Sequence, residues 1–415
     1  MTPPNAPLPL PANRWARYVD RDLVIALLAL IGIGVVMLAS ASLWVAEKQY
    51  QDAYFYVDRQ LTFLGIGLCL GLIMYQIRLA FWEQLGVRLL PFVMLLLILV
   101  LIPGLGREVN GSRRWLNLII MPVQVSELAK LIMLMYLSGY LIRHGKNLAA
   151  SPSYQPLLIP LLVLGLTGGL LMLEPDFGST VVIISTGLAL LFLGGVPLKR
   201  LGVLLGGAIF IMLPLAFMGY RGRRLQAFWN PWDYQSDIGY QVVNAQMAIG
   251  DGGWFGVGLG GGVQKLFYLP EAHNDFIFSV IAEEFGFIGM LIVLCLYGWL
   301  VARAFVIGFQ ADKNGQHYGA YLAYGIGFWI GLQVILHIGV NLAIVPNKGL
   351  TLPLMSYGGS SLMMTLIAMA LLMRVYRETQ TTQFGVSERK ATTMRSTQQA
   401  LTKRTTTIRR TVRGT

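Results

Sequence analysis

The chain is poor in charge and in the residues that build metal centres. Asp, Glu, Lys and Arg make up only 13% of its 415 residues, and there are two cysteines and four histidines. Cys69 and Cys295 both lie in apolar runs, so we expect them to pack as apolar side chains rather than to form a disulfide or a metal site. The sequence also has no Walker motif, which excludes direct use of ATP.

What the chain has instead is apolar residues, 55% of the total, in long continuous runs. A soluble domain cannot bury this much apolar surface, whereas a helix of ~20 apolar residues spans the hydrocarbon core of a bilayer. We therefore expect an all-α integral membrane protein. Ten spans are predicted, at about residues 23–46, 61–76, 84–103, 122–142, 156–173, 178–196, 201–219, 276–309, 318–344 and 351–376.

The net charge of +12 is explained by the positive-inside rule, so no nucleic-acid partner is expected. Basic residues precede the first span, follow the fourth and sixth, and fill the tail, which places both termini in the cytoplasm. The predicted units are a cytoplasmic segment at 1–22, a membrane domain at 23–377 and a basic, disordered tail at 378–415. The tail touches anionic lipid or only fixes the topology.

The outer side then carries a long, structured loop between the seventh and eighth spans, at about residues 220–275. Loops of this length are usually functional. Val242, Ala245 and Ile249 share one helical face, which predicts an amphipathic helix on the membrane surface or over a cavity. The segment GVGLGGG at 256–262 contains G-x-G-x-x-G, but it lacks a βαβ unit and indicates a tight turn beside a substrate rather than a dinucleotide site.

Several basic residues fall on this outer side, against the positive-inside rule. They are Arg107, Arg113, Arg114, Arg221, Arg223, Arg224, Lys265 and Lys348. One explanation is pairing with Glu47, Asp52, Glu108 or lipid phosphate. The other is an anionic ligand in the outer leaflet, for which Arg is suited because its fork donates two hydrogen bonds to one phosphate.

Carboxylates inside apolar runs are the second unusual feature. Glu127 and Lys130 lie three residues apart, on one face of the fourth span. Charges inside a span usually face a cavity or each other, so this pair either meets a substrate or only locks two helices. Glu283 and Glu284 lie in the eighth run, and Glu283 is on much the same face as Asp275.

Asp275 lies at the outer lip of the eighth span, in the stretch YLPEAHNDFIFSVIAEEFGF. It is either an N-cap for the helix that begins at Phe276 or a general base, which needs a partly desolvated site and a proton within reach. His273, two residues earlier, is equally compatible with a hydrogen-bonding and a catalytic role.

Five ordered segments together resemble the SEDS family (shape, elongation, division, sporulation), most closely its cell-division branch. They are NGSRRWLNL…MPVQVSELAKL, EPDFGST, RRLQAFWNPW, YLPEAHNDFIFSVIAEEFGF and PNKGLTLPLMSYGGSS. The resemblance covers about residues 20–377. It implies a peptidoglycan glycosyltransferase in the bacterial inner membrane, at the division septum. Its substrate would be lipid II, an undecaprenyl-diphosphate disaccharide-peptide, and its partners a class B penicillin-binding protein and other division-complex membrane proteins.

The resemblance also assigns site residues. The family's essential outer aspartate falls on Asp275, as the base for an acceptor hydroxyl. The candidates for substrate binding are Arg114, Trp115, Glu127, Lys130, Arg223, Arg224, His273, Glu283 and Lys348. Phe267 departs from the pattern, because many division members have an acid near that position. A divalent cation, Mg²⁺ or Mn²⁺, would assist through Asp275 or Glu283, and no other cofactor or metal cluster is expected.

Two other functions stay open. In a lipid II flippase, charged residues within the spans would line a path, and Glu127 and Lys130 would matter more than Asp275. A scaffold that only recruits the class B penicillin-binding protein would tolerate Asp275→Asn.

Overall fold

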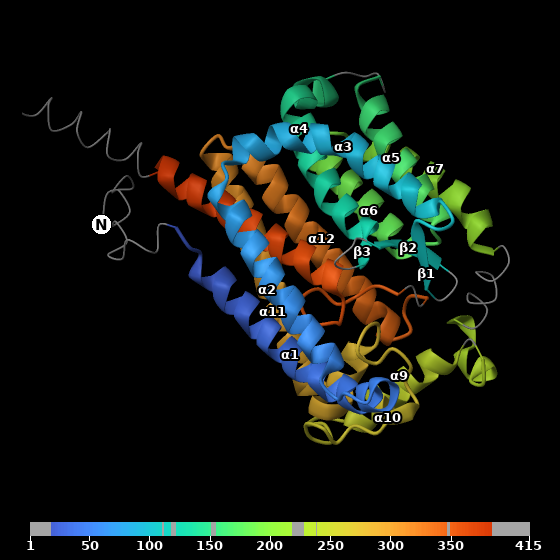
Figure 1. Ribbon diagram of the computed structural model, residues 1–415. Helices are drawn as coiled ribbons and strands as arrows, with labels where there is room; N and C mark the ends of the chain where they lie inside the picture. Colours follow the sequence, from blue (N-terminus) through green and yellow to red (C-terminus); the bar gives the residue numbers. More distant parts are fainter. Residues whose placement is uncertain are drawn as a thin grey trace, which may run out of the picture.

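The structure is a computed structural model that describes residues 18–109, 112–117, 122–150, 155–217, 228–237, 239–346 and 349–383. It is built mainly of helices (Figure 1). Their bounds are α1 Arg21–Tyr50, α2 Phe55–Gln76, α3 Leu79–Leu101, α4 Val125–Ala150, α5 Gln155–Leu173, α6 Phe177–Leu193, α7 Leu198–Phe217, α9 Tyr240–Gly252, α10 Gln264–Phe267, α11 Ile277–Lys313 and α12 His317–Asn341. A final helix covers Gly359–Gln383, and a 3₁₀ turn, η2, covers Pro231–Tyr234.

Among the described residues, eight helices are long and apolar enough to cross a membrane: α1 to α5, α11, α12 and the final helix. The shorter apolar helix α6 has 17 residues, and α7 has 20. Each of the ten expected spans overlaps a helix, so the all-α integral membrane fold is confirmed. The number of ten crossings stays a prediction.

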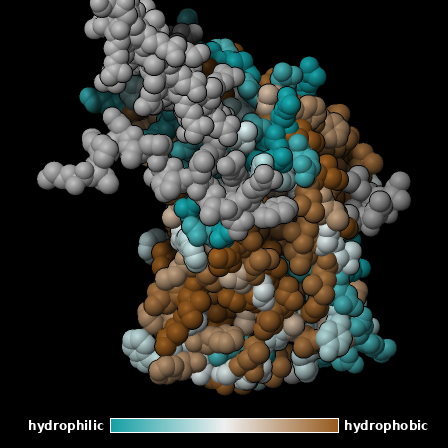
Figure 2. All heavy atoms as spheres, turned by 90° about the vertical axis from the view of Figure 1, so that its left-hand side faces the viewer, coloured by the Kyte–Doolittle hydropathy of each residue, from teal (hydrophilic) through white to brown (hydrophobic). Residues whose placement is uncertain are grey.

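The helices form a central group and a peripheral group. In α4, 89% of the most apolar window is buried inside the protein, whereas in α2 and α3 only 22% is buried. α12 and the final helix are also mostly buried. The peripheral helices expose the lipid-facing surface, and Figure 2 shows a broad band of hydrophobic side chains on one face of the molecule.

A small sheet interrupts the helical pattern on the segment between α3 and α4. Strands β1 (Gly106–Val109), β2 (Ser112–Asn117) and β3 (Pro122–Gln124) pair antiparallel in that order. The span expected at 122–142 therefore begins later, at Val125. Pro122 suits the start of an edge strand, because it has no amide to donate to a ladder.

The end of the bundle remote from this sheet is closed by polar contacts. Asp20 caps α1 by accepting the amide of Leu23 at 2.9 Å, and it forms an ion pair with Arg303 of α11. The final helix begins at Gly359 and runs to Gln383, so its last turn extends into the predicted tail. Residues 384–415 lie outside the described residues.

The helix expected in the outer loop is α9. Val243, Ala245 and Ala248 are buried, and α9 packs mainly on the outer part of α11. The choice between a place on the membrane surface and a place over a cavity stays a prediction.

The eighth predicted span is broken at Gly286, which has φ 64° and ψ −160°. The break leaves backbone groups of α11 without helical partners, and the glycine-rich loop supplies them. Amides 257 and 258 donate to the carbonyls of Glu283 and Glu284, both at 3.0 Å. Amides 287 and 288 donate to the carbonyls of Gly253 and Trp254, at 2.9 and 3.2 Å. The glycine-rich segment thus docks on α11 and completes its hydrogen bonding.

Candidate functional site

The main chain that carries Asp275 is held at three consecutive carbonyl groups. The carbonyl of His273 accepts the amide of Tyr357 at 2.9 Å. The carbonyl of Asn274 accepts Ser356 Oγ at 2.7 Å, and that of Asp275 accepts Asn341 Nδ2 at 2.9 Å. Two other segments, α12 and the turn before the final helix, therefore fix the path of the loop that ends at Asp275.

Asp275 does not occupy the cap position of α11. The cap residue is Phe276, which makes no side-chain cap bond. The amide of Ser279 donates instead to Asn341 Oδ1 at 3.0 Å, and the Ser279 hydroxyl donates to the same oxygen at 2.7 Å. The N-cap interpretation of Asp275 is therefore wrong, because a side chain from α12 does the capping.

A guanidinium from the small sheet and the Asp275 carboxylate approach the same glycine, Gly349. Asp275 Oδ2 is 3.4 Å, and Arg114 Nη1 3.9 Å, from the point where a Cβ on Gly349 would lie. Gly349 has φ 61°, a conformation that favours glycine. Asp275, Arg114 and Gly349 thus converge at one end of the bundle.

The turn between α5 and α6 anchors this guanidinium. Arg114 Nη2 donates to the carbonyl of Pro175 at 2.6 Å, and its Nε donates to that of Glu174 at 3.4 Å. The Glu174 side chain is fully buried, and neither of its carboxyl oxygens has a hydrogen-bond partner. Burial raises the pKa of Glu174 to about 9, with Asp176 adding to this and Arg114 opposing it. The raised pKa disfavours the charged form of the Glu174 carboxyl, so this group competes less for the positive charge of Arg114.

His273 is buried between aromatic rings. Its ring centroid is 4.3 Å from that of Tyr56 and 5.8 Å from that of Tyr357. Burial lowers the pKa of His273, and nearby Glu271 opposes the change. A neutral, packed imidazole fits a supporting role better than a charged contact with a diphosphate, and substrate binding by His273 stays a prediction.

Glu127 and Lys130 form a buried ion pair in α4, at 2.8 Å between Nζ and Oε1. Lys130 also donates to Gln333 Oε1 of α12 at 3.0 Å, and Trp329 Nε1 donates to the same oxygen at 2.9 Å. The pair therefore joins two central helices. This fits the locking interpretation, and a substrate contact stays a prediction.

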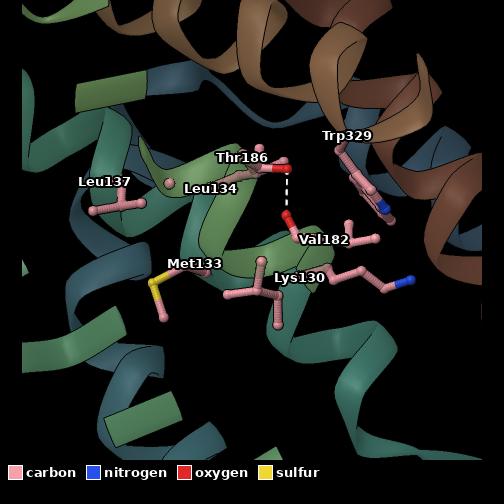
Figure 3. A pocket seen from close by; sticks show the side chains of 9 residues that line it. Lys130, Met133, Leu134, Leu137, Val182, Thr186 and Trp329 are labelled. Atoms are coloured by element: carbon pink, nitrogen blue, oxygen red, sulfur yellow. Dashed lines mark hydrogen bonds between the residues drawn. The ribbon is translucent and has the colours of Figure 1, made fainter. Parts of the chain in front are cut away.

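A small, mainly apolar cavity adjoins this pair, between α4, α6 and α12. Figure 3 shows Lys130 and Trp329 on one side of it, with Met133 and Leu137 on the other. The dashed line marks the bond from the Thr186 hydroxyl to a carbonyl of α6. The side chains that line this cavity suit packing rather than recognition of a polar headgroup.

The two acids of the eighth run have different partners, as expected for adjacent helical residues, which point ~100° apart. Glu283 Oε1 accepts the amides of Val263 and Gln264 at 2.6 and 3.1 Å. Glu284 forms a fully buried ion pair with Lys265 and accepts Ser40 Oγ of α1 at 2.7 Å. Lys265 is thus occupied within the protein, and substrate binding by Glu283 stays a prediction.

The remaining candidates are less informative. Trp115 lies on β2, opposite Arg107 on one side and Gln124 on the other. Arg113 pairs with Glu108 at 3.0 Å on the surface, which confirms the pairing alternative for this arginine. Lys348, Arg223 and Arg224 lie outside the described residues.

The described residues contain no group of three His, Cys, Asp or Glu side chains that could hold a metal ion. Glu283 is buried and already binds two amides. Within the part of the chain that the structure describes, the side chains therefore do not fit a metal held by the protein alone.

Sequence reasoning missed a polar stripe on α12. Trp329, Gln333, His337 and Asn341 recur every four residues and are almost completely buried. Gln333 Nε2 donates to the carbonyl of Thr351 at 3.0 Å, and His337 Nδ1 donates to that of Leu350 at 2.6 Å. The four-residue spacing was the available signal, because polar residues on one face of a span usually face protein rather than lipid.

The chain was compared with known proteins. A family model described as cell cycle protein, covering FtsW, RodA and SpoVE, matches residues 21–381. A probable peptidoglycan glycosyltransferase FtsW of Thioalkalivibrio sulfidiphilus is 50% identical over 367 residues, 88% of this chain and 91% of that protein. Its counterpart in Legionella pneumophila is 44% identical over 377 residues, 91% and 95% of the two chains.

Solved structures agree with the sequence comparison. The rod shape determining protein RodA of Thermus thermophilus is 31% identical, with a TM-score of 0.63, over 87% of this chain and 97% of that one. A chain from work on the structural coordination of polymerization and crosslinking by a peptidoglycan synthase complex is 31% identical. Its TM-score is 0.70, over 87% and 98% of the two chains.

Proposed function

The chain belongs to the family of cell cycle proteins that includes FtsW, RodA and SpoVE, and we propose that it is a peptidoglycan glycosyltransferase that polymerises lipid II. The observation that carries the proposal is the convergence of Asp275 Oδ2 and Arg114 Nη1 on Gly349. A carboxylate and a guanidinium that approach the same glycine supply the two charges that transfer of a sugar from a diphosphate requires. One removes a proton, and the other stabilises the leaving group.

In the proposed reaction, Asp275 removes the proton from the acceptor sugar hydroxyl. The hydroxyl oxygen bonds to the anomeric carbon of the donor as the bond from that carbon to the diphosphate breaks. Arg114 is proposed to bind the departing diphosphate, and Arg223, Arg224 and Lys348 to add positive charge. A divalent cation, Mg²⁺ or Mn²⁺, would have to take most of its ligands from the diphosphate, as Mg²⁺ often does.

The setting of the reaction is also proposed. Both termini would lie in the cytoplasm, and the site would face the outer leaflet of the inner membrane at the division septum. A class B penicillin-binding protein and other division-complex proteins would be the partners. This rests on family membership and on the relative that was studied as part of a peptidoglycan synthase complex.

The test uses the full-length protein purified with its cognate class B penicillin-binding protein and supplied with lipid II. We expect glycan strands whose formation continues when the transpeptidase is blocked by a β-lactam. If the folded complex makes no polymer but moves lipid II across liposome membranes, the flippase alternative replaces this proposal. If it does neither, the scaffold alternative does.

Arg114→Ala is expected to lower lipid II polymerisation by ~10-fold or somewhat more, because one charge-assisted hydrogen bond is worth roughly 1.5–3 kcal/mol. Arg113→Ala is the matched control. Arg113 is the adjacent residue and pairs at the surface with Glu108, and such pairs contribute only about 0–1 kcal/mol. Equal rates for the two variants would remove Arg114 from the proposed site.

A further inference from the structure

The polar stripe of α12 ends at the carboxylate loop. Asn341 is the last residue of α12 and is fully buried. Its side chain makes four contacts with three different elements. Oδ1 accepts the amide and the hydroxyl of Ser279, at 3.0 and 2.7 Å. Nδ2 donates to the carbonyls of Asp275 and His337, at 2.9 and 2.8 Å. One side chain thus satisfies all its hydrogen-bonding groups while it joins α11, α12 and the loop.

The two ends of the Asn341 amide have separable effects. The oxygen caps the N-terminus of α11, which any buried helix end requires. The N–H group holds the main chain of Asp275, for which helix stability gives no reason. A hydrogen bond to the residue that bears the base restricts where its carboxylate can lie.

The same polar stripe of α12 also holds the segment that faces Asp275. Gln333 and His337 hold the carbonyls of Thr351 and Leu350, and this segment continues directly from Gly349, against which Asp275 Oδ2 lies. α12 therefore sets the position of both the loop with Asp275 and the segment that faces it.

We propose that Asn341 is a positioning residue, which holds Asp275 at its working distance from Arg114 and the 349–352 segment without touching the substrate. This rests on the proposed function, because Asp275 is the base of that reaction. Catalytic groups must be held within fractions of an ångström, and a misplacement of 1 Å can cost ~100-fold in rate.

The test compares Asn341→Asp with Ser279→Ala. Asn341→Asp keeps the oxygens that accept from Ser279 but removes the N–H group that holds Asp275. Ser279→Ala removes one bond on the capping side and leaves that N–H group in place. We expect Asn341→Asp to lower kcat for lipid II polymerisation by ~10-fold with little change in KM. Ser279→Ala should stay within about two-fold of the wild type, because its lost bond is worth only roughly 1 kcal/mol and is remote from the base.

Asn341→Leu and a pH profile separate positioning from charge. Suppose that Asn341→Asp acted only by placing a second carboxylate near Asp275. The polymerisation rate of Asn341→Asp would then recover at high pH. The uncharged variant Asn341→Leu would have the kcat of the wild type. Either result would overturn the proposal, as would an equal loss in Ser279→Ala and Asn341→Asp. A parallel loss of kcat in both Asn341 variants supports it.

Hydrogen exchange gives a readout that does not depend on activity. In Asn341→Asp, amides in residues 273–276 should exchange faster than in the wild type, while those in α11 stay unchanged. Unchanged exchange at 273–276 would show that Asn341 does not hold the loop, whatever the enzyme does. If the wild type lacks polymerase activity but Asn341→Asp still exchanges faster at 273–276, the proposed function has failed while the hold of Asn341 on the loop stands.

Discussion

Asp275→Asn is expected to lose glycan polymerisation by at least ~100-fold, as is typical when a general base is removed. The substitution keeps the size of the side chain, but the amide cannot take the proton of the acceptor hydroxyl. The fold should be unaffected, because the helix that follows is capped by Asn341 and the loop is held through main-chain carbonyls. The measurement is strand synthesis from lipid II by the complex with its transpeptidase, with thermal unfolding in detergent as the check on folding.

Asp251→Asn is the matched control, because Asp251 is an exposed acid on α9, also in the outer loop. It should polymerise at the rate of the wild type. If Asp275→Asn folds, binds the transpeptidase and still makes strands at nearly the normal rate, Asp275 is not the base. Asp275→Glu should keep part of the activity, since the chemical group is retained but reaches about one methylene too far.

Gly286→Ala is expected to destabilise the protein by roughly 3 kcal/mol or more. Its φ and ψ are open essentially to glycine alone, and such strain costs on the order of 1–3 kcal/mol. A Cβ would also lie 2.5 Å from the amide nitrogen of Gly256 and 2.6 Å from that of Phe255. These are backbone atoms, so the loop at 253–258 would have to leave α11 and give up its hydrogen bonds. The measurement is thermal unfolding of the purified protein in detergent.

Gly298→Ala is the control in the same helix, because nothing lies within 4 Å of the Cβ that it would add. In a helix interior, alanine is favoured over glycine by up to ~1 kcal/mol, so this variant should be as stable as the wild type or more stable. Equal melting temperatures for the two variants would mean that the break at Gly286 is not required by the fold.

The positions of the helices could be predicted because the lipid imposes a simple rule on composition, and every expected span overlaps a helix. The small sheet could not be predicted, because its strands have only 3 to 6 residues and form only by pairing with one another. The break at Gly286 was equally hidden. Glycine is common in membrane helices, and the unusual backbone conformation is set by a loop that docks from elsewhere in the chain.

The candidate site, like the fold, could be predicted from the sequence only in part. Asp275 could be identified as a candidate at the end of a predicted span, because a charged residue beside an apolar run is visible in the sequence. Its proximity to Arg114 was not visible, because tertiary packing alone brings β2, the 349–352 segment and the start of α11 together. The capping role assigned to Asp275 as an alternative failed for a related reason. A local motif predicts a local cap, whereas this helix uses Asn341 from a neighbouring helix.

The break in α11 sets the position of the Asp275 carboxylate along the axis of the helix bundle. Residues 287–313 are about 40 Å long at 1.5 Å per residue, and α12, which packs against them from a short turn, is about 38 Å long. Gly286 and Asn341 therefore lie at similar levels. An unbroken helix would carry Asp275 roughly 16 Å further outward, yet its carbonyl lies 2.9 Å from the side chain of Asn341. The outer segment of α11 must run sideways. Asp275, the proposed base, is thus kept level with the C-terminal end of α12.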